Sequence, residues 1–140
     1  MITAIDTNVI GALWDRDPAL SSAAQAALDS ALGQGSLLVS APVFAELLAA
    51  PGRDESLLDR FFRDTGISVD WNFNEAVWRA AGLAFGAYAA RRKQHGDSGP
   101  WRLLADFVIG AHAMRKAHRL LTLDDRFFRI AFPRLRVVRV

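Results

Sequence analysis

The sequence contains no cysteine among its 140 residues. Disulfide frameworks, cysteine-ligated zinc sites, iron–sulfur clusters and thiol nucleophiles are therefore excluded together. Any metal ion in this protein must bind through oxygen atoms or imidazole nitrogens.

Long hydrophobic runs are also absent. The apolar stretches are interrupted well before the roughly 18 residues that a membrane-spanning helix needs. The N-terminal segment MITAIDTNVI has neither the basic region nor the apolar region of a secretory signal. We therefore expect a cytoplasmic protein with no membrane partner.

The overall composition is that of an ordinary globular protein. Hydrophobic residues make up 51% of the chain and charged residues 23%, which excludes a disordered or collagen-like chain. A chain of this length is typical of one domain. We expect residues 1–140 to form a single domain.

Charge is distributed unevenly along the chain. Residues 1–114 carry 9 basic and 13 acidic side chains, whereas residues 115–140 carry 8 basic and 2 acidic ones. A basic end beside an acidic body suits a polyanion that approaches a site, because phosphate contacts are electrostatic. A solvated arginine-rich face would give the same pattern, and the charges alone do not separate the two interpretations.

Short apolar runs alternate with segments of helical periodicity, which indicates an α/β protein. We predict a three-layer sandwich in which helices flank a mostly parallel central sheet. The last long helix is expected at Trp101–Ala117. The expected strands are Ile2–Ile5, Leu37–Val39, Ile67–Val69, Arg119–Thr122 and Leu135–Val140.

Acidic residues follow two of the expected strands directly. Asp6 ends the first strand, and Asp124 and Asp125 follow the strand Arg119–Thr122. Ligands of open parallel sheets bind outside the carboxyl ends of the strands. We therefore expect these carboxylates to meet at one edge of the sheet.

Two further acids lie in otherwise apolar helical segments: Glu46 in VFAELLAA and Asp106 in LLADFVIGA. Burying a carboxylate is costly unless something compensates its charge, and Mg²⁺ or Mn²⁺ compensates several at once. Each acid also has a simpler interpretation. Asp6 could cap a helix, Glu46 could face solvent, Asp106 could favour a helix dipole, and Asp124 could occupy a turn.

Four segments, taken in order, resemble a known family. They are Ile5–Val9, Val43–Leu47, Ala105–Ala113 and Leu120–Asp124, and together they span nearly the whole chain. They resemble the four acidic motifs of PIN domains. Within that family they look most similar to the VapC toxins of bacterial toxin–antitoxin pairs.

This resemblance implies a metal-dependent endoribonuclease with a PIN-like fold. Asp6, Glu46, Asp106 and Asp124 would be the catalytic acids that hold Mg²⁺ or Mn²⁺. The metal would activate a water that hydrolyses a phosphodiester bond, so no side-chain nucleophile is needed. Transfer RNA and ribosomal RNA are both plausible substrates for the family.

The resemblance also implies partners. A cognate VapB-type antitoxin would lay an amphipathic segment in an apolar groove, for which Trp14, Phe44, Leu47 and Leu48 are candidates, although these residues could equally belong to the core. A homodimer is expected from the resemblance alone.

Several residues near the motifs are candidates for supporting roles. Asn8 would orient Asp6 or its loop, and Thr122 would be a polar group beside the site. His112 is expected in the core, bonded to backbone, with a substrate contact as the alternative. Arg102 would pair with an acid, contact RNA phosphate or lie on the surface. Asp125 would assist the metal or occupy a turn.

Ser40 precedes the helix that carries Glu46. Its hydroxyl is placed to cap this helix, and we prefer that structural role to a catalytic one.

Two other functions compete with the nuclease. A phosphatase with an aspartate nucleophile also begins with an Asp after its first strand, but it needs a second Asp two residues later, where this chain has Asn8. A non-catalytic PIN-fold module would bind RNA or protein without cleaving it. Loss of one or more acids would be its sign, and all four are present.

Overall fold

The computed structural model describes all residues, 1–140. Strands and helices alternate along the chain as the sequence predicts. In chain order the elements are β1 (Ile2–Ile5), α1 (Thr7–Leu13), α2 (Pro18–Gly33), β2 (Ser36–Ser40), α3 (Ala41–Ala49), α4 (Glu55–Thr65), β3 (Ser68–Asp70), α5 (Glu75–His95), α6 (Leu104–Lys116), β4 (Arg119–Thr122), α7 (Asp125–Ala131) and β5 (Val137–Arg139).

The five strands form one sheet in the order β3-β2-β1-β4-β5, and every neighbouring pair is parallel. The first strand therefore lies at the centre of the sheet. Because all strands run the same way, all of their carboxyl ends meet at one edge. The expected α/β sandwich with a parallel sheet is confirmed.

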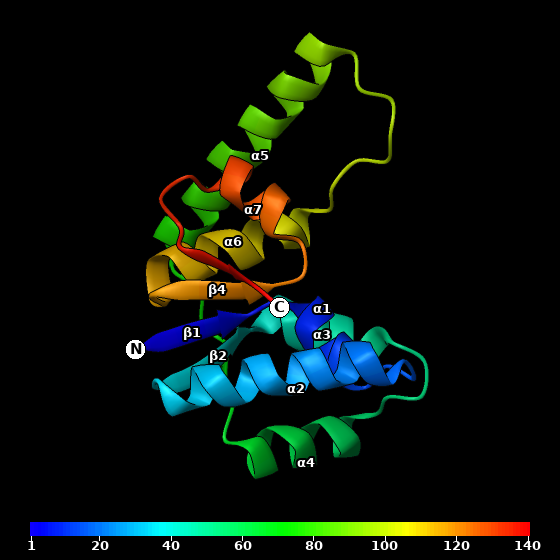
Figure 1. Ribbon diagram of the computed structural model, residues 1–140. Helices are drawn as coiled ribbons and strands as arrows, with labels where there is room; N and C mark the ends of the chain where they lie inside the picture. The colour runs from blue at the N-terminus through cyan, green and yellow to red at the C-terminus, as the bar shows by residue number, and fades with distance from the viewer.

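Helices cover the sheet on both sides. Figure 1 shows α5, α6 and α7 grouped in the upper half of the molecule, α2 and α4 in the lower half, and β1, β2 and β4 between them. Helices α1 and α3 lie at the end toward which the strand arrows point. The helices that follow β1 and β2 therefore begin at the carboxyl edge.

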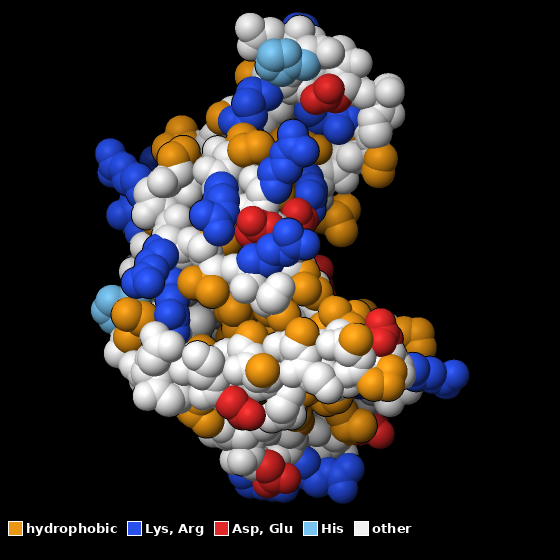
Figure 2. All heavy atoms as spheres, in the orientation of Figure 1, with side chains coloured by type: hydrophobic (Ala, Val, Ile, Leu, Met, Phe, Trp, Pro, Cys, Tyr) orange, Lys and Arg blue, Asp and Glu red, His pale blue; other side chains and the backbone are white.

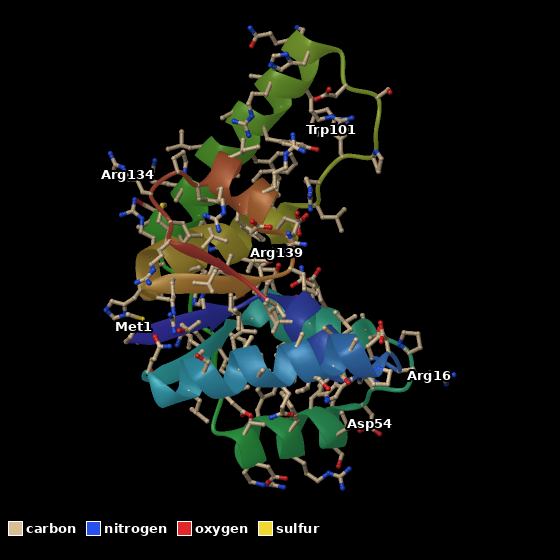
Figure 3. The ribbon with its side chains drawn as sticks, viewed as in Figure 1. Met1, Arg16, Asp54, Trp101, Arg134 and Arg139 are labelled. Carbon is tan, nitrogen blue, oxygen red and sulfur yellow. The ribbon has the colours of Figure 1, made fainter.

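One element boundary differs clearly from the prediction. Helix α6 begins at Leu104, not at Trp101, because Leu103 has the extended backbone of a helix cap and Asp106 accepts a hydrogen bond from its N–H. The preceding residues pack against α5: Trp101 contacts the ring of Tyr88, and Figure 3 shows Trp101 between α5 and the α5–α6 loop. This tertiary contact holds residues 101–103 outside the helix.

A single cluster of 28 buried hydrophobic residues runs through the sheet and the helices on both sides. Phe107 of α6 and Phe128 of α7 are its largest fully buried side chains. None of the helices combines the length and the hydrophobicity needed to span a membrane.

The packing of α6 against Phe132 depends on a glycine inside this helix. A Cβ atom built on Gly110 would lie 2.2 Å from Cε2 of Phe132, a ring that is itself buried. Glycine destabilises a helix interior, so its presence here is explained by the ring that packs against it.

We predict that Gly110→Ala destabilises the protein by about 1–3 kcal/mol, since the added methyl group overpacks the contact with Phe132. Urea unfolding measures the change. Gly82→Ala in α5 is the matched control, because nothing lies within 4 Å of its Cβ position. That control should gain about 0.5–1 kcal/mol from helix propensity. Equal effects of the two substitutions would contradict the packing explanation.

Candidate active site

The carboxyl edge of the sheet opens into a hollow. Figure 2 shows the molecule indented on the side toward which the strands of Figure 1 point, between the α5–α6 half and the α1–α3 half. The backbone N–H of Asp6 donates to the carbonyl of Leu121 at 3.0 Å, so the β1–β4 pairing continues to this edge. Asp6 and Thr122 therefore become neighbours.

Asp6 is buried, with 6% of its surface exposed, and both of its carboxylate oxygens are hydrogen-bonded. Oδ1 accepts the N–H of Thr7 at 2.8 Å, and Oδ2 accepts the hydroxyl of Thr122 at 2.7 Å. Because β1 and α1 position the first bond and β4 the second, the carboxylate is held rigidly.

Burial raises the pKa of Asp6 to about 6. The hydrogen bonds from Thr122 and Thr7 oppose this shift, whereas the charges of Asp106 and Glu46 add to it. No lysine, arginine or histidine forms an ion pair with Asp6. The carboxylate therefore carries a charge that the protein itself does not neutralise.

Glu46 reaches the same edge from α3. Its Oε1 accepts the hydroxyl of Thr7 at 2.6 Å, and Thr7 is the residue whose N–H binds Asp6. Thr7 therefore links the two carboxylates. It follows Asp6 in the first acidic motif, but the sequence did not indicate this hydrogen bond because its partner lies 39 residues away.

Asp106 lies in the first turn of α6, where its side chain accepts the N–H of Leu103. Burial raises the pKa of Asp106. The Leu103 N–H and the charge of Arg102 oppose the shift, and the charge of Asp124 adds to it. The charge of Asp106 thus interacts with the charges of Asp6 and Asp124.

Asp124 follows β4 and is paired with a base. Arg102 Nη1 donates to Asp124 Oδ2 at 2.5 Å, and its guanidinium lies 4.2 Å from the ring centre of Phe127. Of the alternatives for Arg102, the structure shows the pairing with an acid. Both side chains are about one-third exposed, so the pair is accessible from solvent.

Comparison with known proteins agrees with this architecture. The sequence profile of the PIN domain matches residues 3–133. The chain belongs to the PIN domain family. No curated protein matches it significantly.

Several solved structures are similar over almost the whole chain. VapBC2 from Rickettsia felis, bound to a DNA fragment from its promoter, has a TM-score of 0.65 at 21% identity and covers 99% of this chain and 98% of its own. VapBC-1 from nontypeable Haemophilus influenzae has a TM-score of 0.64 at 22% identity, with coverage of 99% and 98%. FitAcB from Neisseria gonorrhoeae has a TM-score of 0.60 at 25% identity, with coverage of 98% and 96%.

In this PIN domain, Asn8 does not bond to Asp6, although we expected it to orient Asp6 or its loop. It contacts the loop after β4 instead. Its Oδ1 accepts the N–H of Leu123 at 3.1 Å, and its Nδ2 lies 3.5 Å from the hydroxyl of Thr122. Thr122 is completely buried; its hydroxyl also accepts the N–H of Asp124 at 2.9 Å. Asn8 and Thr122 therefore join the first acidic motif to the fourth.

Asp125 is paired with two bases. It lies 3.4 Å from Arg129 and 3.8 Å from Arg139, so these two arginines neutralise its charge. The expectation of a turn residue is wrong, because Asp125 is the first residue of helix α7.

Ser40 does not cap α3, which contradicts our expectation. The residue occupies the cap position, but its side chain makes no cap hydrogen bond, and its buried Oγ has no hydrogen-bond partner in the protein. Pro42 near the start of α3 removes one backbone N–H that a cap would have satisfied.

His112 lies in the core, as expected, but the predicted backbone bond is wrong. Its Nε2 lies 3.0 Å from Oδ2 of Asp70, at the end of edge strand β3, and its ring lies 5.3 Å from that of Phe73. The sequence did not reveal Asp70 as the partner because 42 residues separate the two.

No three histidine, aspartate or glutamate side chains lie close enough together to hold a metal ion in this arrangement. The carboxylates are instead engaged by Thr7, by the N–H of Leu103 and by Arg102. The donor set is nevertheless suited to a hard divalent cation, since Asp6 is buried without a base beside it and its neighbours are also carboxylates.

The His112–Asp70 pair predicts a pH-dependent stability. Burial lowers the pKa of His112; Asp70 opposes the shift and the charge of Lys116 adds to it. A histidine whose pKa is lowered on folding contributes stability that is complete above the unfolded pKa of about 6.5 and is lost as the pH falls below it. Asp70 contributes only at lower pH: burial raises its pKa, but bonds from Asn72 and His112 and the charges of His112 and Lys116 leave the pKa lowered.

We therefore predict that His112 lowers the free energy of unfolding between pH 7.5 and pH 5.5, with a slope of at most about 1.4 kcal/mol per pH unit from this histidine. The raised pKa of Asp6, about 6, acts in the opposite direction over the same range, so the contribution of His112 is the difference between wild type and a His112 variant. Urea unfolding at both pH values measures it. His112→Gln, which cannot be protonated, should reduce this dependence. An unchanged pH profile in the variant would show that His112 is not the responsible group.

Proposed function

We propose that this protein is a VapC-type toxin: a metal-dependent endoribonuclease that is held inactive by a cognate antitoxin. The single observation that carries the proposal is the buried, unneutralised carboxylate of Asp6, which interacts with Asp106 and Glu46 at the carboxyl edge of a parallel sheet. Such a group requires a cation, and its position is where sheets of this kind bind their ligands.

Asp6, Glu46, Asp106 and Asp124 would hold Mg²⁺ or Mn²⁺. A divalent cation there would make a bound water more acidic and would place positive charge beside a phosphate. Carboxylate oxygens are the ligands that both ions prefer, which supports this assignment.

The protein's own residues would keep these acids in position. Thr122 orients Asp6 through its hydroxyl, and Thr7 orients Glu46. Arg102 lies at the rim, where it now holds Asp124. Since its guanidinium is partly exposed, it could exchange this carboxylate for an RNA phosphate, leaving Asp124 for the cation.

The surface charge supports RNA as the substrate. Figure 2 shows many Lys and Arg side chains over the half of the molecule built from α5–α7 and β5, next to the hollow. Transfer RNA and ribosomal RNA remain the proposed targets, and the cytoplasm, where both occur, is the proposed location.

We predict that RNA cleavage requires Mg²⁺ or Mn²⁺, stops with EDTA, and falls at least about 100-fold in Asp6→Asn and in Asp106→Asn, because each removes a charge that holds the cation. Purified antitoxin-free protein is incubated with total RNA, and fragment ends are mapped. Asp59→Asn is the matched control, since Asp59 lies exposed on α4.

Metal-dependent cleavage that is seen in wild type and Asp59→Asn, but not in the two site variants, supports the nuclease function. If folded wild-type protein binds RNA without cleaving it in either metal, the non-catalytic module is the better description. Cleavage that persists in both site variants places the active site elsewhere.

A cavity between α1 and α4 is the proposed antitoxin contact. Its volume is about 430 Å³, and Trp14, Arg53, Leu57, Arg60 and Phe61 line it. The guanidinium of Arg53 lies 4.5 Å from the Trp14 ring centre, and its buried Nε has no hydrogen-bond partner. This lining suits a segment that presents an apolar side chain beside a carboxylate.

Of the other groove candidates, Leu47 is 2% exposed and belongs to the core. Phe44 and Leu48 are partly buried and pack against the core. Of the four groove candidates, Trp14 is the only one that lines the cavity between α1 and α4.

We predict that Trp14→Ala weakens binding to the antitoxin encoded beside this protein by about 10-fold or more, as expected for an aromatic residue at the centre of an interface. Calorimetric titration measures the affinity. Trp78→Ala is the control, since Trp78 is a half-exposed tryptophan on α5, away from this cavity. Equal losses in the two variants would exclude the α1–α4 cavity as the contact.

We also propose a homodimer. An apolar cavity of about 650 Å³ lies between α5, α6 and the segment after α7, and Leu83 on its rim is 76% exposed. Exposed apolar surface of this kind is typical of an interface between subunits.

A further inference from the structure

A separate cavity lies on the face of the sheet that α2 covers. Its volume is about 230 Å³. Thr3 of β1, Arg119 of β4 and Val138 of β5 line it from the sheet, and Ala27, Ser30 and Gln34 line it from α2. None of the acids of the candidate active site contributes to it.

Arg119 is the unusual residue in this cavity. Only 6% of its surface is exposed, although arginine is among the residue types that are almost never fully buried without a partner. Its side chain forms no ion pair, and the only hydrogen bond of this side chain runs from Nε to the hydroxyl of Thr3 at 2.8 Å.

Arg119 lines the cavity with two free donor nitrogens. Neither Nη forms a hydrogen bond within the protein and neither is fully buried, so both keep some contact with solvent. Ser30 and Gln34 also line the cavity, with the amide of Gln34 donating to the hydroxyl of Ser30 at 3.4 Å, and no carboxylate lines it. Arg139 contributes further positive charge, although it also lies near Asp125.

The cavity is distinct from the acidic edge. Thr3 and Arg119 are direct partners in the β1–β4 register, three residues before Asp6 along β1. At about 3.3 Å per residue, the two sites lie about 10 Å apart along the strand. Figure 3 labels Arg139, the last residue of β5, which lines the cavity.

We propose that this cavity is a phosphate-binding site in which the planar guanidinium of Arg119 holds two phosphate oxygens. Arginine binds phosphate in this bidentate way, and Nε is already fixed by Thr3, which orients the free donors. The volume is below the range of drug-sized pockets, so the site takes a phosphate with little more than an attached sugar.

The phosphate could belong to a small molecule, such as inorganic phosphate or a mononucleotide, or to the backbone of an RNA strand. The chemistry that Arg119 recognises is the same in both. The test therefore uses inorganic phosphate, AMP and a short single-stranded RNA as separate probes. It contains EDTA and measures binding only, so its result does not depend on whether the protein cleaves RNA.

The experiment compares wild type, Arg119→Met and Arg126→Met in chloride buffer at constant ionic strength. Calorimetry gives the affinity for each probe, and thermal unfolding gives the melting temperature with and without phosphate. Arg126 is the matched control, because it is an exposed arginine on α7. Its replacement by Met removes the same charge outside the cavity.

We expect phosphate to raise the melting temperature of wild type and of Arg126→Met. Arg119→Met should bind phosphate about 10- to 100-fold more weakly, as the loss of charge-assisted hydrogen bonds requires. Without phosphate it should melt no lower than wild type, because it removes an unneutralised buried charge. If Arg119 served only to stabilise the fold, its replacement by Met would instead lower the melting temperature.

The RNA probe identifies the source of the phosphate. If Arg119→Met weakens RNA binding more than Arg126→Met does, the site holds a phosphate of the strand. If only phosphate and AMP are affected, it holds a small molecule. Equal phosphate affinity in all three proteins, or an equal response to acetate, overturns the proposal.

A second variant protects the test against misfolding of Arg119→Met. Ala27→Leu keeps Arg119 but fills the cavity from α2, where leucine is a good helix former. It should lose phosphate binding in the same way. Retained binding in a folded Ala27→Leu protein would likewise overturn the proposal.

Discussion

The pairing of β1 with β4 is the interaction on which the rest of the structure depends. It joins segments that lie 116 residues apart in sequence, and it ends on the hydrogen bond from Thr122 to Asp6. Thr122 also binds the backbone of Asp124, so a single buried hydroxyl connects the first acidic motif to the fourth. Helices α1 and α7 begin at these two strand ends, and their directions follow from the same pairing.

Uncompensated charge characterises both ends of this strand pair. At the carboxyl edge, Asp6 is negative and buried beside other acids, which favours a cation. Three residues earlier, the partner of Thr3 is Arg119, a buried positive charge without an acid, which favours an anion. Because burying an ion is costly unless it is paired, each group indicates a ligand of opposite charge. The two ligands would lie on one rigid pair of strands.

Much of the fold could be predicted from local patterns. Apolar runs such as Ile2–Ile5 indicated buried strands, and the helices between them indicated a parallel sheet, which the structure confirms. The start of α6 could not be predicted, because the contact of Trp101 with Tyr88 keeps residues 101–103 outside the helix. The acids could be proposed from their positions after strands and in apolar helices. Their assignment as metal ligands stays a prediction.

The sequence by itself determined the alternation of strands and helices, the four acidic motifs and membership of the PIN family, because each depends on residues close together in the chain. Only the tertiary structure decided the partners of single side chains. It placed Thr7 on Glu46, Arg102 on Asp124, and Asp70 on His112, and it left Arg119 without an acid. These contacts join elements far apart in sequence, so they follow from strand order and helix packing, which no local pattern encodes.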